Sequence, residues 1–147
     1  MSLNQRSMIV CLGELLIDFV PETSGQALSE VVAFKRAAGG APANVAACAA
    51  KLGSTSRFIG KIGQDAFGEY LRRSLTEVGV ETQLVETSEA RTGLAFVSLR
   101  EDGERDFLFY RGPAADMLLK AEEVEDAWLE DAAVYHFGSV SLIAEPC

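Results

Sequence analysis

The residues best suited to binding a ligand lie in one short segment, Gly39-Gly40-Ala41-Pro42-Ala43-Asn44. Two consecutive glycines let a ligand approach bare backbone N–H groups. A helix that starts near Pro42 adds the partial positive charge of its N-terminus, which favours oxygen-rich ligands. Asn44 offers both a donor and an acceptor, which suits a sugar hydroxyl. A plain tight turn has the same spacing, so spacing alone leaves the function open.

The two common nucleotide-binding fingerprints are missing from the sequence. Gly60-Lys61 is followed by Ile62, and Thr55 stands where a P-loop needs its first glycine. No Gly-x-Gly-x-x-Gly follows the first apolar run.

Alternating strands and helices are expected to position the diglycine segment. Met8–Leu12 is a continuous apolar run typical of a buried strand, and Leu15–Val20 continues in alternation with Glu14, Leu16 and Asp18 on one side. Val31–Lys35 is a further candidate strand.

Two helices are predicted beyond these strands. Small residues from Pro42 to Leu52 predict a helix that packs closely against a sheet and stops at Gly53. After a short strand at Phe58–Gly60, Asp65 is a plausible N-cap for a second helix. Its apolar residues recur at helical spacing: Phe67, Leu71, Leu75 and Val78. Strand, helix, strand, helix implies parallel crossovers and an α/β fold.

The segment from Thr92 to Arg111 predicts an antiparallel hairpin, because Asp102-Gly103 is a strong turn signal between two β-rich runs. With these two residues as the loop, Phe96 is expected opposite Phe109 and Leu94 opposite Arg111. One face then carries Leu94, Phe96, Phe107, Phe109 and Arg111, and the other carries Ala95, Val97, Leu99, Leu108 and Tyr110. Both faces are apolar, leaving one to cover a ligand and the other to meet a partner subunit.

The last third predicts an acidic helix at Glu122–Leu129 and a strand at Ala133–Phe137. The acidic cluster Glu122, Glu123, Glu125 and Asp126 fits a solvated helix face, so no metal site is predicted. The sequence given ends soon after the predicted strand at Ala133–Phe137, with no helix to cover that strand, so the predicted α/β sheet looks incomplete.

Composition excludes several classes of function. The 147 residues include 22 Asp plus Glu against 13 Lys plus Arg, a formal net charge of −9 that opposes nucleic acid and anionic membrane surfaces. No membrane span or signal peptide is evident. The three widely spaced cysteines form no Cys-x-x-Cys pair, so neither disulfides nor a zinc site is expected. These features favour a cytoplasmic protein.

The order of residues from Gly39 onward also resembles a known sequence signature. Gly39-Gly40-Ala41-Pro42-Ala43-Asn44-Val45-Ala46, then Gly53 and Gly63, resembles the first signature of the PfkB family of carbohydrate kinases, which contains ribokinase and fructokinase. Residues 13–18 and 60–68 look like its opening strand and second-strand loop. Residues 114–118 and 137–147 look most like the fructokinase branch.

The resemblance implies a sugar site. Asp18 matches the family's sugar-binding aspartate, and Gly39, Gly40 and Asn44 match its sugar-binding turn. Phe96 and Phe109 match lid aromatics that cover the apolar side of the sugar, although a plain cross-strand pair is an equal alternative. Arg111 matches a lid arginine near the substrate.

The resemblance also implies a fold and an activity. The expected fold is a ribokinase-like, Rossmann-type α/β/α sandwich with a small β-sheet lid, here truncated. Residues 1–147 would form the N-terminal part of a single kinase domain, with lid strands at about 14–36 and 92–111. The expected reaction is ATP-dependent phosphorylation of D-fructose to fructose 6-phosphate, with Mg²⁺, by a homodimer paired through the lid.

The family's catalytic base and ATP pocket belong to a later segment that these residues do not contain, so no catalytic residue is assigned and the fragment itself is expected to be inactive. Two alternatives remain open. One is a family member acting on 2-keto-3-deoxygluconate, ribose or adenosine, and the other is a noncatalytic sugar-binding fragment.

Overall fold

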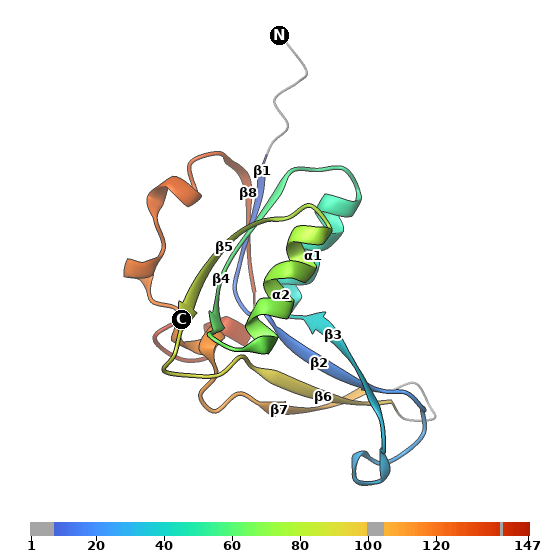
Figure 1. The fold of residues 1–147 in the computed structure, drawn as a ribbon. Helices are drawn as coiled ribbons and strands as arrows, with labels where there is room; N and C mark the ends of the chain where they lie inside the picture. The colour runs from blue at the N-terminus through green and yellow to red at the C-terminus, as the bar shows by residue number, and fades with distance from the viewer. Residues whose placement is uncertain (1–7, 100–104, 139) are drawn as a thin grey trace.

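Two four-stranded β-sheets form the body of the protein (Figure 1). The computed structural model describes residues 8–99, 105–138 and 140–147. The first sheet is parallel, in the order β5-β4-β1-β8. Its strands are β1 (Met8–Leu12), β4 (Ser56–Gly63), β5 (Glu81–Thr87) and β8 (Ala132–Phe137). The predicted α/β fold with parallel crossovers is therefore confirmed.

The second sheet has the order β3-β2-β6-β7 and is smaller and mixed. Its strands are β2 (Leu16–Pro21), β3 (Phe34–Gly39), β6 (Leu94–Leu99) and β7 (Arg105–Tyr110). The chain passes from the first sheet to the second within three residues after β1, at Gly13, Glu14 and Leu15. This crossing point lies at the carboxyl end of a parallel strand, where open α/β sheets commonly bind their ligands.

Both α-helices, α1 (Ala41–Lys51) and α2 (Ala66–Glu77), lie on the same side of the parallel sheet (Figure 1). The sheet grows in one direction from β1 to β4 to β5, so right-handed crossovers place successive helices on one face. On the opposite face a short 3-10 turn, η2 (Ala115–Leu118), packs against β4, and the Lys61 ammonium donates to the Leu118 carbonyl at 3.0 Å.

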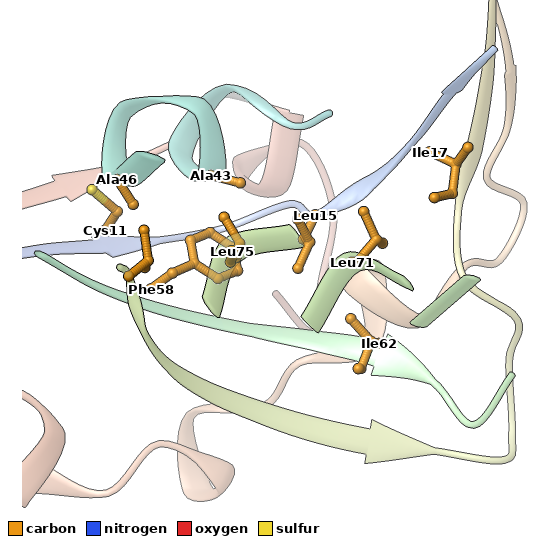
Figure 2. Packing of buried hydrophobic residues seen from close by; sticks show 10 residues of the cluster. Cys11, Leu15, Ile17, Ala43, Ala46, Phe58, Ile62, Leu71 and Leu75 are labelled. Carbon is orange, nitrogen blue, oxygen red and sulfur yellow. The ribbon is translucent and has the colours of Figure 1, made fainter. Parts of the chain in front are cut away.

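The hydrophobic core fills the space between the parallel sheet and the two helices (Figure 2). Phe58 of β4 is fully buried against alanines of α1 and leucines of α2. The buried cluster consists of Cys11, Leu15, Ile17, Ala43, Ala46, Phe58, Ile62, Leu71, Leu75 and Val80. The small residues of α1 bring its backbone close to β1, so the start of α1 is held firmly beside the crossing point.

Asp65 caps α2 as predicted. Its Oδ1 accepts from the backbone N–H groups of Phe67 at 3.0 Å and Gly68 at 2.9 Å, and its Oδ2 accepts from the Thr92 N–H at 2.9 Å. Burial alone would raise the pKa of Asp65, but these hydrogen bonds outweigh burial and lower it. The cap thus joins α2 to the residues that precede β6.

Three elements of the structure differ from the sequence analysis. The strand expected at Val31–Lys35 starts later, at Phe34, and β5 was not predicted. The acidic helix expected at Glu122–Leu129 is two short 3-10 turns, η3 (Ala121–Glu123) and η4 (Asp126–Trp128). A tertiary contact competes with helix formation there, because the Glu123 carboxylate accepts from the buried Lys61 ammonium at 2.6 and 2.7 Å.

Candidate functional site

A cavity of about 370 Å³ lies where the two sheets meet the start of α1. It is lined by Glu14, Leu16, Asp18, Val20, Gly40, Ala41, Asn44, Val97, Phe107, Phe109 and Val140. Its polar side chains are Glu14, Asp18 of β2 and Asn44 of α1, whereas the side chains from the β6–β7 hairpin, Val97, Phe107 and Phe109, are all apolar. Such a mixed lining suits a small molecule with one hydroxylated and one apolar side.

Asp18 is the polar group most available to a ligand. It lies on β2 between Ala37 of β3 and Ala95 of β6, whose small side chains leave its carboxylate clear. Within the described ranges no group donates a hydrogen bond to this carboxylate, and burial raises its pKa. Asp18 can therefore accept hydrogen bonds from a bound molecule.

The diglycine turn is required by its surroundings. A Cβ at Gly39 would lie 2.3 Å from Oδ2 of Asp18. Gly40 has φ +106°, and a Cβ there would lie 2.2 Å from the Glu14 carbonyl oxygen. Each glycine thus makes room for one of the acidic residues that line the cavity.

Asn44 lies one turn into α1 and is exposed. Its side chain lines the cavity with Asp18, and its backbone N–H donates to the Gly40 carbonyl at 2.9 Å. The amide is free to give one hydrogen bond and receive another. The structure therefore brings Asp18, Gly40 and Asn44 to one cavity, with Gly39 directly behind the Asp18 carboxylate.

Glu14 is a site residue that sequence reasoning did not single out. It is only 2% exposed, yet it lines the cavity. Its Oε1 accepts from the Ala41 N–H at 3.1 Å, and its Oε2 accepts from the Ser141 hydroxyl at 2.7 Å. The available signal was an acidic residue placed directly after a buried parallel strand.

The hairpin is antiparallel as predicted, but its predicted register was wrong by one residue. Phe96 lies opposite Leu108, and Phe109 lies opposite Ala95. The predicted Asp102-Gly103 turn lies outside the described residues. Because side chains alternate between faces, a shift of one residue moves β7 side chains to the other face relative to β6. The cavity face therefore carries Ala95, Val97, Phe107 and Phe109.

A cluster of aromatic rings holds Phe96 on the opposite face and explains this register. Phe96 stacks on Phe19 of the neighbouring β2 strand, with ring centroids 5.0 Å apart, and makes edge contacts with Phe34 and Tyr110. Phe96 does not line the cavity that contains Asp18. Phe107, which was not a predicted site residue, does line it, and its ring lies parallel to that of Phe109 at 5.7 Å.

Arg111 also lies away from the cavity lining. Its guanidinium donates to Oδ2 of the buried Asp116, through Nε at 3.0 Å and through a second nitrogen. Because two nitrogens of its guanidinium donate to Asp116, Arg111 stabilises the segment after β7 and does not face a molecule beside Asp18.

The arrangement can hold a neutral, hydroxyl-rich molecule between a carboxylate, an amide and two aromatic rings. Among the described residues no group of three or more His, Cys, Asp or Glu side chains is placed to hold a metal ion. No described helix is long and apolar enough to cross a membrane. The described residues that line the cavity include no lysine or arginine to bind a triphosphate, so ATP would need residues other than these.

Comparison with known proteins gives a consistent result. The family model described as pfkB family carbohydrate kinase matches residues 6–147. The chain is 54% identical over 143 residues to Fructokinase-1 of Zea mays, and the match covers 97% of the chain and 44% of that protein. The chain thus spans less than half the length of this relative.

Solved structures show the same fold. A crystal structure of fructokinase from Xylella fastidiosa is 46% identical, with a TM-score of 0.79, and the match covers 90% of the chain and 41% of that structure. An uncharacterized sugar kinase from Pyrococcus horikoshii in complex with ATP is 37% identical, with a TM-score of 0.88, and the match covers 94% of the chain and 45% of that structure.

Proposed function

Because the chain belongs to the pfkB family of carbohydrate kinases, we propose that it supplies the sugar-binding side of a fructokinase. The complete enzyme transfers the γ-phosphoryl group of ATP to the 6-hydroxyl of D-fructose. One observation carries the proposal: the Asp18 carboxylate, which accepts no hydrogen bond from a described residue, lies beside the Gly39-Gly40 turn in a cavity of about 370 Å³. The names of the similar proteins, fructokinases of Zea mays and Xylella fastidiosa, support fructose as the substrate.

In this proposal, the residues of the chain bind and orient the sugar. Asp18 accepts hydrogen bonds from sugar hydroxyls, and Asn44 gives one hydrogen bond and accepts another. Phe107 and Phe109 cover the apolar face of the sugar ring and exclude water from it. A site built to accept hydroxyl protons rejects analogues that lack those hydroxyls, because its polar groups are then left unpaired.

ATP and Mg²⁺ belong to the proposal for the complete enzyme. ATP supplies the transferred phosphoryl group, and Mg²⁺ neutralises charge on its phosphates. Support for ATP comes from the ATP-bound sugar kinase of Pyrococcus horikoshii, which has the same fold. We propose that the catalytic base and the ATP site lie in a segment beyond residue 147, and that the enzyme acts in the cytoplasm.

A homodimer paired through the second sheet is part of the same proposal. The face of that sheet opposite the cavity has a groove of about 400 Å³, lined by Leu28, Phe34, Leu94, Phe96, Leu108 and Tyr110. Leu108 and Tyr110 are 48% and 61% exposed. An apolar surface of this kind is stabilised when a second subunit covers it.

The experiment that tests the proposed function is a phosphorylation assay on the full-length protein that contains this chain. With ATP and Mg²⁺, we expect kcat/KM to be highest for D-fructose in a panel with D-ribose, adenosine and 2-keto-3-deoxygluconate. If another member of the panel gives the highest kcat/KM, that compound replaces fructose as the proposed substrate. The isolated 147-residue chain is the matched control and is expected to show no phosphorylation.

A further inference from the structure

The loop between β4 and α2 carries a motif whose residues do not line the cavity that contains Asp18, Gly63-Gln64-Asp65-Ala66-Phe67-Gly68. Its first glycine allows a close approach between two distant parts of the chain. A Cβ at Gly63 would lie 2.6 Å from Oδ2 of Asp65 and 2.6 Å from the Thr92 nitrogen. The motif therefore brings the Asp65 carboxylate against the residues that lead into the β6–β7 hairpin.

Asp65 and Thr92 are joined by a closed set of hydrogen bonds. The Thr92 N–H donates to Oδ2 of Asp65 at 2.9 Å, and the Thr92 hydroxyl donates to Oδ1 at 2.8 Å. The same hydroxyl accepts from the Gly63 N–H at 3.2 Å. Thr92 is buried, and hydrogen bonds to an ionised acceptor are stronger than neutral ones. The chain just before β6 is thus held firmly to the start of α2.

Thr92 directly precedes the strand pairing that holds Asp18. The Gly93 carbonyl accepts from the Ile17 N–H at 2.9 Å, and β6 then runs beside β2 and pairs with it at Asp18. The Asp65 carboxylate is therefore connected to the strand that carries the ligand-binding carboxylate through two adjacent residues of the hairpin entry.

The chain that leaves the hairpin is tied to the chain that enters it. Arg111 follows β7 and donates to Oδ2 of the buried Asp116. The neighbouring Ala115 N–H donates to the Arg91 carbonyl at 2.8 Å, one residue before Thr92. Both ends of the hairpin thus meet at one anchoring point, and Asp65 joins that point to α2.

The hairpin side chains at the cavity lie beyond this anchoring point. Val97 lies about 17 Å along an extended strand from Thr92, and Phe107 pairs with Val97. A small rotation of the chain at Thr92 is therefore enlarged at these side chains. The diglycine turn at the start of α1 does not depend on the anchoring point, so such a rotation changes the distance between the apolar cover and the polar groups of the cavity.

We propose that Asp65 is a positioning residue for sugar binding. By holding Thr92, it sets where the apolar side chains of the hairpin lie over a sugar bound at Asp18. This inference rests on the proposed function as a sugar kinase and adds to it a residue that lies outside the cavity.

The variant Asp65→Asn separates positioning of the hairpin from capping of α2. The Asn side-chain oxygen still accepts from the Phe67 and Gly68 N–H groups, and Asn is as good an N-cap as Asp. Its NH₂ group replaces Oδ2 and cannot accept from the Thr92 N–H. The variant therefore keeps the cap and breaks the link to the hairpin.

Matched variants control for charge and for shape. Glu69→Gln removes one negative charge from the exposed side of the same first turn of α2. Thr92→Val keeps the shape of the side chain but removes the hydroxyl, so the Gly63 N–H loses its acceptor. Thr92→Ser keeps the hydroxyl and is the conservative variant at that position.

The test measures kinetics and hydrogen exchange on the full-length protein that contains this chain. With ATP and Mg²⁺, Asp65→Asn is expected to raise KM for fructose about fivefold or more and to leave KM for ATP within about twofold, because a misplaced cover weakens sugar binding. A loss of folded protein alone would lower kcat and leave KM for fructose unchanged.

Hydrogen exchange reports directly on the hairpin. In Asp65→Asn the amides of β6 and β7 are expected to exchange faster, whereas those of α2 keep the wild-type rate because the cap remains. Thr92→Val is expected to behave like Asp65→Asn in both measurements. Thr92→Ser and Glu69→Gln are expected to behave like the wild type.

The failures of the two proposals are distinguishable. If fructose is phosphorylated and Asp65→Asn leaves its KM unchanged, the positioning role is overturned and the proposed function stands, whatever the exchange rates. Faster exchange in α2 as well as in the hairpin would also overturn it, because a lost cap would then explain the effect. If no sugar is phosphorylated, the proposed function fails, and the exchange rates of the hairpin decide whether Asp65 positions it.

Discussion

Asp18 is a partly buried carboxylate whose ionised form is unfavourable in the folded protein. Its carboxylate is half-buried, and no described group donates a hydrogen bond to it. Burial raises the pKa of Asp18, which means that the ionised form is less favourable in the folded chain than in the unfolded one. Such a group lowers the free energy of unfolding at neutral pH. A bound ligand would offset this cost by donating hydrogen bonds to the carboxylate.

Asp18→Asn is therefore expected to stabilise the protein at pH 7 and to weaken fructose binding by about a hundredfold, because hydrogen bonds to a charged acceptor are lost. The stabilisation is present above the folded-state pKa of Asp18. It disappears as the pH falls below the unfolded value of about 3.9, where the wild-type carboxyl is protonated in both states. Urea unfolding across this pH range, with calorimetric sugar titration, measures both effects. A less stable Asn variant at pH 7 would contradict the prediction.

Alternate side chains of the β6–β7 hairpin face two different surfaces, the cavity and the apolar groove. Phe107 and Phe109 face the cavity, whereas Leu108 between them faces the apolar groove on the other side. The three side chains are similarly exposed, at 50%, 48% and 48%. Differences in their effects on binding therefore report on the face they occupy and not on their burial.

Phe107→Ala and Phe109→Ala are each expected to raise the dissociation constant for fructose about five- to tenfold, since each would remove an apolar surface that covers the sugar in the proposed function. Leu108→Ala is the control and is expected to leave it within about twofold. Calorimetric titration of the three variants provides the measurement. A larger effect from Leu108 than from its two neighbours would show that the hairpin register differs in solution.

The second sheet has two distinct surfaces, one on each side. One surface faces the cavity between the sheets, and the other has the groove around Phe34, Leu108 and Tyr110. The separation allows a subunit to pair through the groove without blocking the cavity. Pairing and sugar binding are then separable by mutation.

Leu108→Lys is expected to convert a homodimer of the full-length protein into monomers, because a buried, unpaired ammonium at the groove would be strongly unfavourable. Sedimentation velocity measures the change, and calorimetry is expected to show that the monomer still binds fructose. Thr76→Lys, on the exposed side of α2, is the matched control and should remain dimeric. A monomeric wild-type protein would contradict the proposed pairing.

Much of the fold was predictable from local patterns. A continuous apolar run predicted β1, and the small residues between Pro42 and Lys51 predicted α1. Asp65, as an N-cap, predicted the start of α2. Each of these depends on neighbours within a few residues along the chain. The family resemblance singled out Asp18, Gly40 and Asn44, which line one cavity in the structure.

The register of the hairpin and the charge of the cavity depended instead on contacts between distant residues. Phe96 lies opposite Leu108 because it stacks on Phe19 of β2, a neighbour no local pattern identifies. Glu14 caps a helix 27 residues further along the chain and contacts Ser141, 127 residues away. Sequence periodicity specifies which residues share a face, but a shift of one residue costs little locally and is resolved only by packing across the sheet.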